Sequence, residues 1–96
     1  GSEMHMAPFV PNAGRRGKGP RLGTGVCLAI EPMLTLGRPQ VDEADDGWTV
    51  VSRDGSRAAH TEHSIAIAED GICVLTAPDG GAARLASYGI TPVDLG

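Results

Sequence analysis

Short runs of alternating apolar and polar residues, separated by stretches rich in Gly, Pro and Asp, make up most of the chain. Runs of about four to eight residues with this period are typical of half-buried β-strands. The pattern predicts strands at Val26–Leu36, Trp48–Arg53, Ala59–Ala68 and Ile72–Thr76. Asp-Gly pairs predict turns between the later strands, and the acidic stretch 37–47 is expected to be a loop. Together these elements predict an antiparallel β-meander, followed by a Gly/Pro-rich tail with a helical turn or two at Ala82–Tyr88.

Two glutamates stand out against this pattern. Glu31 interrupts an apolar run just before Pro32, which cannot donate to a ladder and so marks an edge or a bulge. Side chains alternate between the two faces of a strand. Two sets of residues should therefore each share a face: Cys27, Ala29 and Glu31 in one strand, and His60, Glu62, Ser64 and Ala66 in another. If these strands are neighbours, we expect Glu31 and Glu62 to converge.

Two carboxylates about 5 Å apart repel each other by about 3 kcal/mol at an effective dielectric near 20. Such a pair is stable if the two groups share a proton or hold a cation. His60 and His5 add imidazole nitrogens, and mixed carboxylate–imidazole sites suit divalent transition metals. The alternative is that both glutamates are ordinary surface residues on an open sheet face.

Composition narrows the function classes. A chain of 96 residues makes one small domain at most, and its formal net charge of -4 argues against a nucleic-acid partner. The absence of a long apolar run predicts no membrane span. Cys27 and Cys73 lie in apolar runs without a CxxC pair, which predicts buried free thiols in a reducing cytoplasm, with a disulfide between them as the alternative. The basic segment Pro11–Thr24 is interpreted as a solvated loop.

Several segments, taken together, resemble the type I methionine aminopeptidases. They are "GSEMHMAPFVPN" (1–12), "LAIEPML" (28–34), "DGWTVVSRDGSRAAHTEHSIAIAEDG" (46–71) and "VLT" (74–76), which occur in the order of that family. The resemblance runs in register from Gly1 to about Thr76. It implies an α+β fold, the C-terminal part of the pita-bread (creatinase/aminopeptidase-like) architecture, and removal of the initiator methionine from peptides.

The resemblance also implies roles for individual residues. Glu31 falls on a metal-ligating glutamate, and Glu62 on the glutamate that bridges two divalent metal ions (Co, Mn, Fe, Zn and Ni are not distinguished). His5 falls on the histidine that hydrogen-bonds the substrate and the reaction intermediate, which makes it catalytic and substrate-binding. Trp48 falls on a tryptophan near the cleft. His60 stands where many bacterial members carry Gln, so the resemblance assigns it no role.

The family's metal site uses two Asp, one His and two Glu, and only the two Glu lie in these residues. We therefore expect the chain to be a C-terminal fragment that is inactive alone. Residues 1–76 are expected to form the C-terminal part of a catalytic domain, and residues 77–96 a Gly/Pro-rich extension. The resemblance implies a cytoplasmic location, and it implies that the complete protein is a monomer. The implied partners are peptide or nascent-chain N-termini, with the ribosome as a further candidate.

Two alternatives stay open. A proline-specific peptidase of the same superfamily usually continues Glu-Pro with Gly and Tyr and carries Arg two places before the second Glu. Here Met33 follows Pro32, and His60 stands two places before Glu62. The other alternative is a non-catalytic binding scaffold of the same fold, although such relatives tend to lose metal ligands.

Overall fold

The computed structural model describes residues 3–96, which divide into two compact units. The first unit combines the residues up to Ile30 with Glu62–Gly96. The second unit is the intervening stretch Glu31–Thr61.

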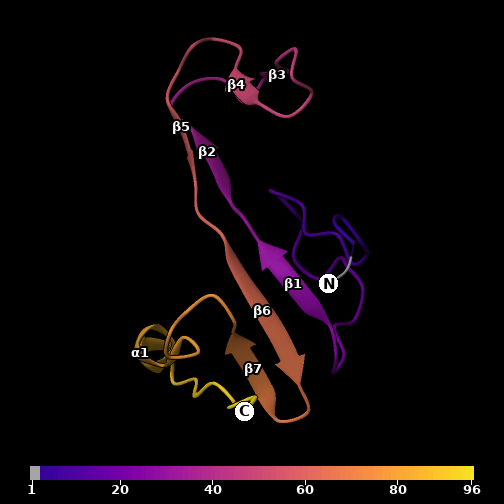
Figure 1. The fold of residues 1–96 in the computed structure, drawn as a ribbon, viewed down its shortest axis with the longest axis vertical. Helices are drawn as coiled ribbons and strands as arrows, with labels where there is room; N and C mark the ends of the chain where they lie inside the picture. The colour runs from indigo at the N-terminus through magenta and orange to yellow at the C-terminus, as the bar shows by residue number, and fades with distance from the viewer. Residues whose placement is uncertain (1–2) are drawn as a thin grey trace. The chain divides into compact units, whose positions relative to one another are not determined.

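The first unit is built on a three-stranded antiparallel sheet (Figure 1). Its strands are β1 (Cys27–Ile30), β6 (His63–Ala68) and β7 (Gly71–Val74), in the order β1-β6-β7. The register pairs Cys27 with Ala66 and Ala29 with Ser64, so these four small residues share one face. That part of the predicted face is confirmed. The turn predicted at residues 69–71 is also present, and it joins β6 to β7.

The core of this sheet is small. Leu28 on β1 is the one buried large apolar residue among residues 3–96, with 8% of its surface exposed. It lies opposite Ile65, which is half-buried on the central strand. The prediction of two buried thiols is wrong for Cys27, which is exposed because it points to the face of β1 opposite the buried Leu28. Cys73 on β7 is half-buried. Both cysteines are free.

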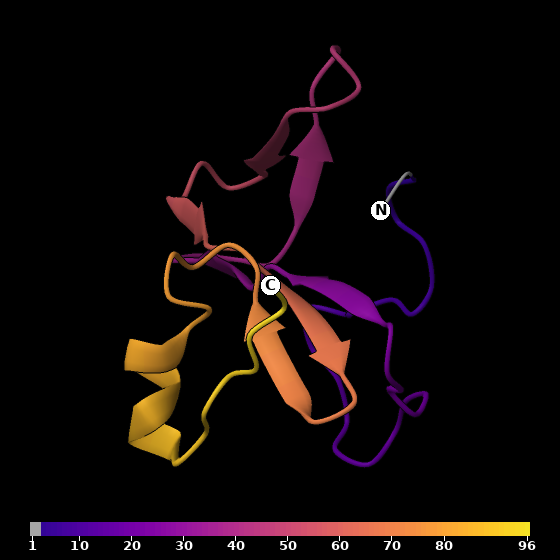
Figure 2. The ribbon, with the colours of Figure 1, turned by 60° about the horizontal axis from the view of Figure 1, so that its bottom comes forward.

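The tail folds back along the outer edge of β7 (Figure 2). The N–H of Val74 donates to the carbonyl of Gly80 at 3.0 Å, and the N–H of Val93 donates to the carbonyl of Ile72 at 2.9 Å. Between these contacts lie the short helix α1 (Ala82–Leu85) and the 3₁₀ helix η1 (Ala86–Tyr88), which confirm the predicted helical turns. The tail thereby covers backbone groups that an edge strand would leave open.

The second unit consists of two separate two-stranded ladders. β2 (Met33–Thr35) pairs with β5 (Ala58–His60), and β3 (Val41–Glu43) pairs with β4 (Val50–Ser52). The predicted strand at 26–36 is therefore two strands, β1 and β2, which end and begin around Glu31 and Pro32. The predicted strand at 59–68 is likewise divided, into β5 and β6, with residues 61 and 62 outside both ladders.

Two further expectations are corrected by the pairing. The acidic stretch 37–47 was expected to be a loop, but the strand β3 lies within it. Arg53 forms a 2.7 Å ion pair with Asp42 and so neutralises one of the carboxylates on β3. The antiparallel pairing is confirmed, but its order is nested rather than sequential as in a meander. β1 pairs with β6 and β2 with β5, so early strands meet late ones. Within residues 3–96 no helix has the length and apolarity to cross a membrane.

Candidate metal-binding site

Glu31 and His60 are brought together in the second unit. The Nε2 atom of His60 lies 3.3 Å from Oε1 of Glu31. His60 ends β5 and is the ladder partner of Met33, which stands two residues after Glu31. The Glu31 side chain is 39% exposed and the His60 side chain 64%. A carboxylate and an imidazole that face each other and remain open to solvent are a donor pair of the kind that divalent transition metals accept.

Glu62 directly precedes β6 in the first unit. The next residue, His63, is held in place, because its Nδ1 lies 2.8 Å from Oγ1 of Thr76. The same hydroxyl oxygen accepts the N–H of Ser64 at 3.1 Å, and the Ser64 carbonyl accepts the N–H of Leu75 at 2.8 Å. The beginning of β6 is thus tied to the residues that follow β7, which positions the backbone beside Glu62.

Sequence reasoning missed this role of Thr76. The sequence pattern places Thr76 at the end of the predicted strand Ile72–Thr76 and of the family-like "VLT" segment, without a contact to His63. A histidine and a threonine 13 positions apart carry no local signal of a contact. The contact arises because the β6–β7 hairpin brings the two ends of its strands together.

His5 lies in the first unit, before the sheet begins. It is exposed, and its φ of 60° makes it the non-Gly residue with left-handed backbone among those described. Such a conformation is uncommon outside Gly, Asn, Asp and His, and it is found most often in turns and at functional sites. It therefore gives the family-like Met-His pair a turned backbone rather than an extended one.

Trp48 lies in the second unit, in the turn between β3 and β4, with 74% of its surface exposed. Asp46 fixes this turn by accepting the N–H of Trp48 at 3.0 Å and the N–H of Thr49 at 2.8 Å. Hydrogen bonds from Thr49, through its hydroxyl first and then its N–H, hold the pKa of Asp46 below its usual value. The ring itself is left free to meet another surface.

The structure therefore joins Glu31 to His60, and it places His5 and Glu62 in the other unit. Across residues 3–96 no group of three or more His, Cys, Asp or Glu side chains is arranged to hold a metal ion. The donors present fit part of a carboxylate–imidazole site, but they do not complete one. The convergence of Glu31 with Glu62 stays a prediction.

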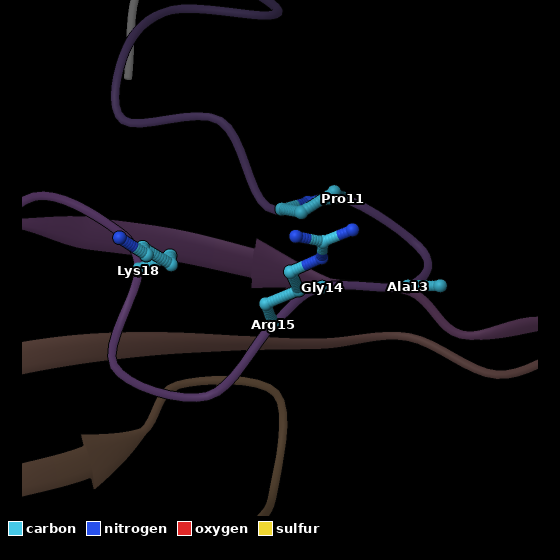
Figure 3. Close-up of a pocket in the computed structure, with 5 residues that line it drawn as sticks. All are labelled: Pro11, Ala13, Gly14, Arg15 and Lys18. Carbon is cyan, nitrogen blue, oxygen red and sulfur yellow. The ribbon is translucent and has the colours of Figure 1, made fainter.

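The basic segment forms a different feature. An open hollow of about 530 Å³ is lined by Pro11, Ala13, Gly14, Arg15 and Lys18 (Figure 3). These residues are exposed, in agreement with a solvated loop. None of the residues expected at the metal site lines this hollow.

Comparison with known proteins identifies the architecture. No protein-family model matches the chain. The chain is 57% identical over 76 residues to methionine aminopeptidase 1 of Mycobacterium tuberculosis. This match covers 79% of this chain and 29% of that protein. It is 49% identical over 76 residues to methionine aminopeptidase 1 of Bacillus subtilis, and this match covers 79% of this chain and 31% of the Bacillus subtilis protein. The crystal structure of a methionine aminopeptidase from Thermotoga maritima superposes with a TM-score of 0.70 at 50% identity, over 77% of this chain and 30% of that one.

The fold is therefore part of the pita-bread architecture of the aminopeptidases, as the resemblance implied. Within that class, the chain corresponds to one part of a methionine aminopeptidase. It spans about 30% of the length of the curated relatives it matches.

Proposed function

We propose that these residues belong to a metal-dependent aminopeptidase that removes the initiator methionine from peptides. The observation that carries the proposal is the combination of 57% identity to a methionine aminopeptidase with two surviving candidate ligands, Glu31 and Glu62. The proposed setting is the cytoplasm, and the proposed substrates are peptide or nascent-chain N-termini. We further propose that the complete protein is a monomer that works near the ribosome.

Glu31 and Glu62 are the proposed protein ligands of two divalent metal ions. Support comes from the ladder of the first unit, in which Ile30 and His63 are partners. Glu31 directly follows Ile30 in the chain, and Glu62 directly precedes His63. Alternation extended by one residue beyond each of these strands would place the two glutamates on the face of Ala29 and Ser64. Two carboxylates on one face are better stabilised by cations than by water alone.

The other residues have proposed roles around this pair. His60 holds one carboxylate oxygen of Glu31 and so orients it as a ligand. His5 donates a hydrogen bond to the carbonyl oxygen of the substrate and so stabilises the negative charge on that oxygen in the tetrahedral intermediate. Trp48 supplies apolar surface beside the substrate. When bound, the metal ions supply Lewis-acid activation of water and of the scissile carbonyl.

The 96-residue chain alone is predicted neither to cleave peptides nor to bind a metal pair tightly. Two carboxylates and one neighbouring imidazole offer too few donors for two five- or six-coordinate ions. Calorimetric titration of the chain with Mn²⁺ checks this expectation. Two sites of micromolar affinity would contradict it.

The proposed activity is best tested in a chimera in which residues 3–76 replace the matching segment of the Thermotoga maritima enzyme. We expect the chimera to release methionine from a Met-Ala peptide and far less from a Met-Lys peptide. Glu31→Ala and Glu62→Ala should each abolish release, whereas Glu69→Ala, in the exposed turn before β7, should not. A folded chimera that cleaves neither peptide would refute the proposal.

The two alternative functions give different results in the same chimera. A proline-specific peptidase would cleave a peptide with Pro in second position better than Met-Ala. A non-catalytic scaffold would fold and bind peptide without any turnover. The relatives described above are all methionine aminopeptidases, which favours the first proposal over both.

A further inference from the structure

Glu62 lies just outside the strand pairing of the first unit. It directly precedes β6, and residues 61 and 62 belong to neither ladder. On the side of β1 the ladder ends with the pair Ile30–His63, and on the side of β7 it ends with the pair Ile65–Val74. A metal ligand binds tightly only when its backbone and rotamer are held in place. The backbone at Glu62 therefore needs a support other than the sheet ladder.

The hydroxyl of Thr76 makes contacts just beyond the end of the β6–β7 ladder. Its Oγ1 atom lies 2.8 Å from Nδ1 of His63 and accepts the N–H of Ser64 at 3.1 Å. The carbonyl of Ser64 accepts the N–H of Leu75 at 2.8 Å. These contacts join the two residues after Glu62 to the two residues after β7, and all of them lie within the first unit.

A threonine hydroxyl is suited to this double contact. It offers one donor and two acceptor positions, so one oxygen can serve an imidazole nitrogen and a backbone N–H together. The β-branched side chain has few χ1 rotamers, which restricts where the oxygen can lie. Val has nearly the same shape without the hydroxyl, and Ser keeps the hydroxyl without the methyl group. Substitution of Thr76 by these two residues therefore separates the hydrogen bonds from the packing.

His63 acts on Glu62 through the backbone. His63 is the first residue of β6 and the ladder partner of Ile30, so the two share a face of the sheet. The glutamates are proposed to lie on the opposite face, that of Ala29 and Ser64. His63 is therefore not placed to share a metal ion with Glu62, and any effect it has on metal binding is one of position.

We propose that Thr76 and His63 are positioning residues for Glu62: the Thr76 hydroxyl fixes the backbone that follows Glu62 and so holds its carboxylate in the orientation that binds metal. The metal role of Glu62 itself rests on the proposed function. Outer contacts that orient a metal ligand are worth about 10- to 100-fold in metal affinity. Because Thr76 acts through intervening residues, we expect an effect at the lower end of that range, about 10-fold.

The alternative is that Thr76 only stabilises the β6–β7 hairpin. Ile67 provides the matched control, because it is half-buried in the same hairpin and pairs with Ile72 at the end far from Glu62. Ile67→Val removes one methylene from a packed side chain, which destabilises a protein about as much as the loss of a hydrogen bond. If Thr76 acted through stability alone, substitutions of Ile67 and Thr76 would affect metal affinity equally.

The first test is Mn²⁺ calorimetry of the chimera that carries residues 3–76. Thr76→Val should weaken Mn²⁺ binding about 10-fold. Thr76→Ser, which keeps the hydroxyl, should bind within about 2-fold of the parent chimera. Ile67→Val should leave the affinity unchanged. His63→Leu should weaken binding as Thr76→Val does, and the two together should weaken it little further, because both remove the same contact.

The second test measures the backbone of Glu62 directly and needs no metal. In the full 96-residue chain, the ¹⁵N order parameter of the Glu62 amide should be near the rigid value of about 0.85 for the parent and for Thr76→Ser. In Thr76→Val it should fall towards about 0.6, the value of a flexible backbone. Circular dichroism of each variant verifies that the sheet is intact.

Three results would overturn the proposal. They are parent-like Mn²⁺ affinity in Thr76→Val while Glu62→Ala loses binding, equal weakening by Ile67→Val, and a Glu62 amide as mobile in the parent as in Thr76→Val. Unchanged Mn²⁺ affinity in Glu62→Ala counts instead against the proposed function, and the order parameters then decide whether the Thr76 hydroxyl fixes this backbone. The two proposals can therefore fail separately.

Discussion

Leu28→Ala should be the substitution that the first unit tolerates least. Leu28 is 8% exposed, faces Ile65 across the β1–β6 ladder, and is the buried large apolar side chain of the described residues. Removing three carbons costs about 2.4 kcal/mol at about 0.8 kcal/mol per buried CH₂. The cavity left behind brings the total to between about 2 and 5 kcal/mol.

That loss is large against the stability of the chain. A well-packed domain of this length would unfold with a free energy of about 5 to 14 kcal/mol. A core of one large residue places this chain at or below the lower end of that range. Leu28→Ala should therefore lower the urea midpoint steeply, or leave the sheet unfolded in water, as measured by far-ultraviolet circular dichroism.

Leu34→Ala provides the comparison. It deletes the same atoms from a side chain that is 70% exposed, so its effect should stay below about 0.5 kcal/mol. Equal destabilisation by the two substitutions would refute the assignment of the core to Leu28.

Three further predictions concern single contacts. The backbone N–H of Arg38 lies 2.7 Å from Oδ2 of Asp54 and is the main cause that lowers the pKa of Asp54 to about 2. This hydrogen bond should persist above pH 4 and be lost as the pH falls through about 2. A pH titration of the Arg38 amide shift with its midpoint near 4 would contradict this. Gly37→Ala should destabilise the second unit, because an added Cβ would overlap the Asp54 carboxylate; an unchanged Arg38 amide shift in that variant would argue against the overlap. Val93→Pro removes the N–H that donates to the Ile72 carbonyl and should lower the free energy of unfolding by about 1 kcal/mol, measured by urea titration. Val93→Ala keeps this N–H but loses part of the side chain, so it reports the contribution of packing alone.

Local chemistry predicted the turns and the breaks well. The Asp-Gly turn after Arg53 is present, with the Gly55 N–H bonded to the Ser52 carbonyl at 3.0 Å. Pro32 interrupts the first strand run where its missing N–H predicts an interruption. Such features depend on one or two neighbouring residues, so the sequence alone contains them.

Features that depend on distant partners were missed. The strand β3 was hidden because Asp42 and Glu43 have low strand propensity, and the ion pair that offsets this comes from Arg53 on the far side of the hairpin. The nested pairing of early with late strands was not visible either, because alternation fixes the face of a side chain but not the partner of its strand.

The candidate site shows the same division. Its residues were found by their similarity to a family motif, while the 3.3 Å contact between His60 and Glu31 was not anticipated. The residue pattern offered His60 as an imidazole donor beside the two glutamates, but the family resemblance assigned it no role. The contact follows from the β2–β5 register, which places His60 opposite Met33 and so within reach of Glu31.

The central claim is that Glu31 and Glu62 are metal ligands, and Mn²⁺ titration of the chimera by calorimetry tests it most directly. We expect two ions to bind, and we expect Glu31→Ala and Glu62→Ala each to weaken binding by more than about 100-fold, since even the loss of an outer contact to a ligand costs 10- to 100-fold. Glu69→Ala should leave both ions in place. Unchanged Mn²⁺ affinity in the Glu31 and Glu62 variants would contradict the claim.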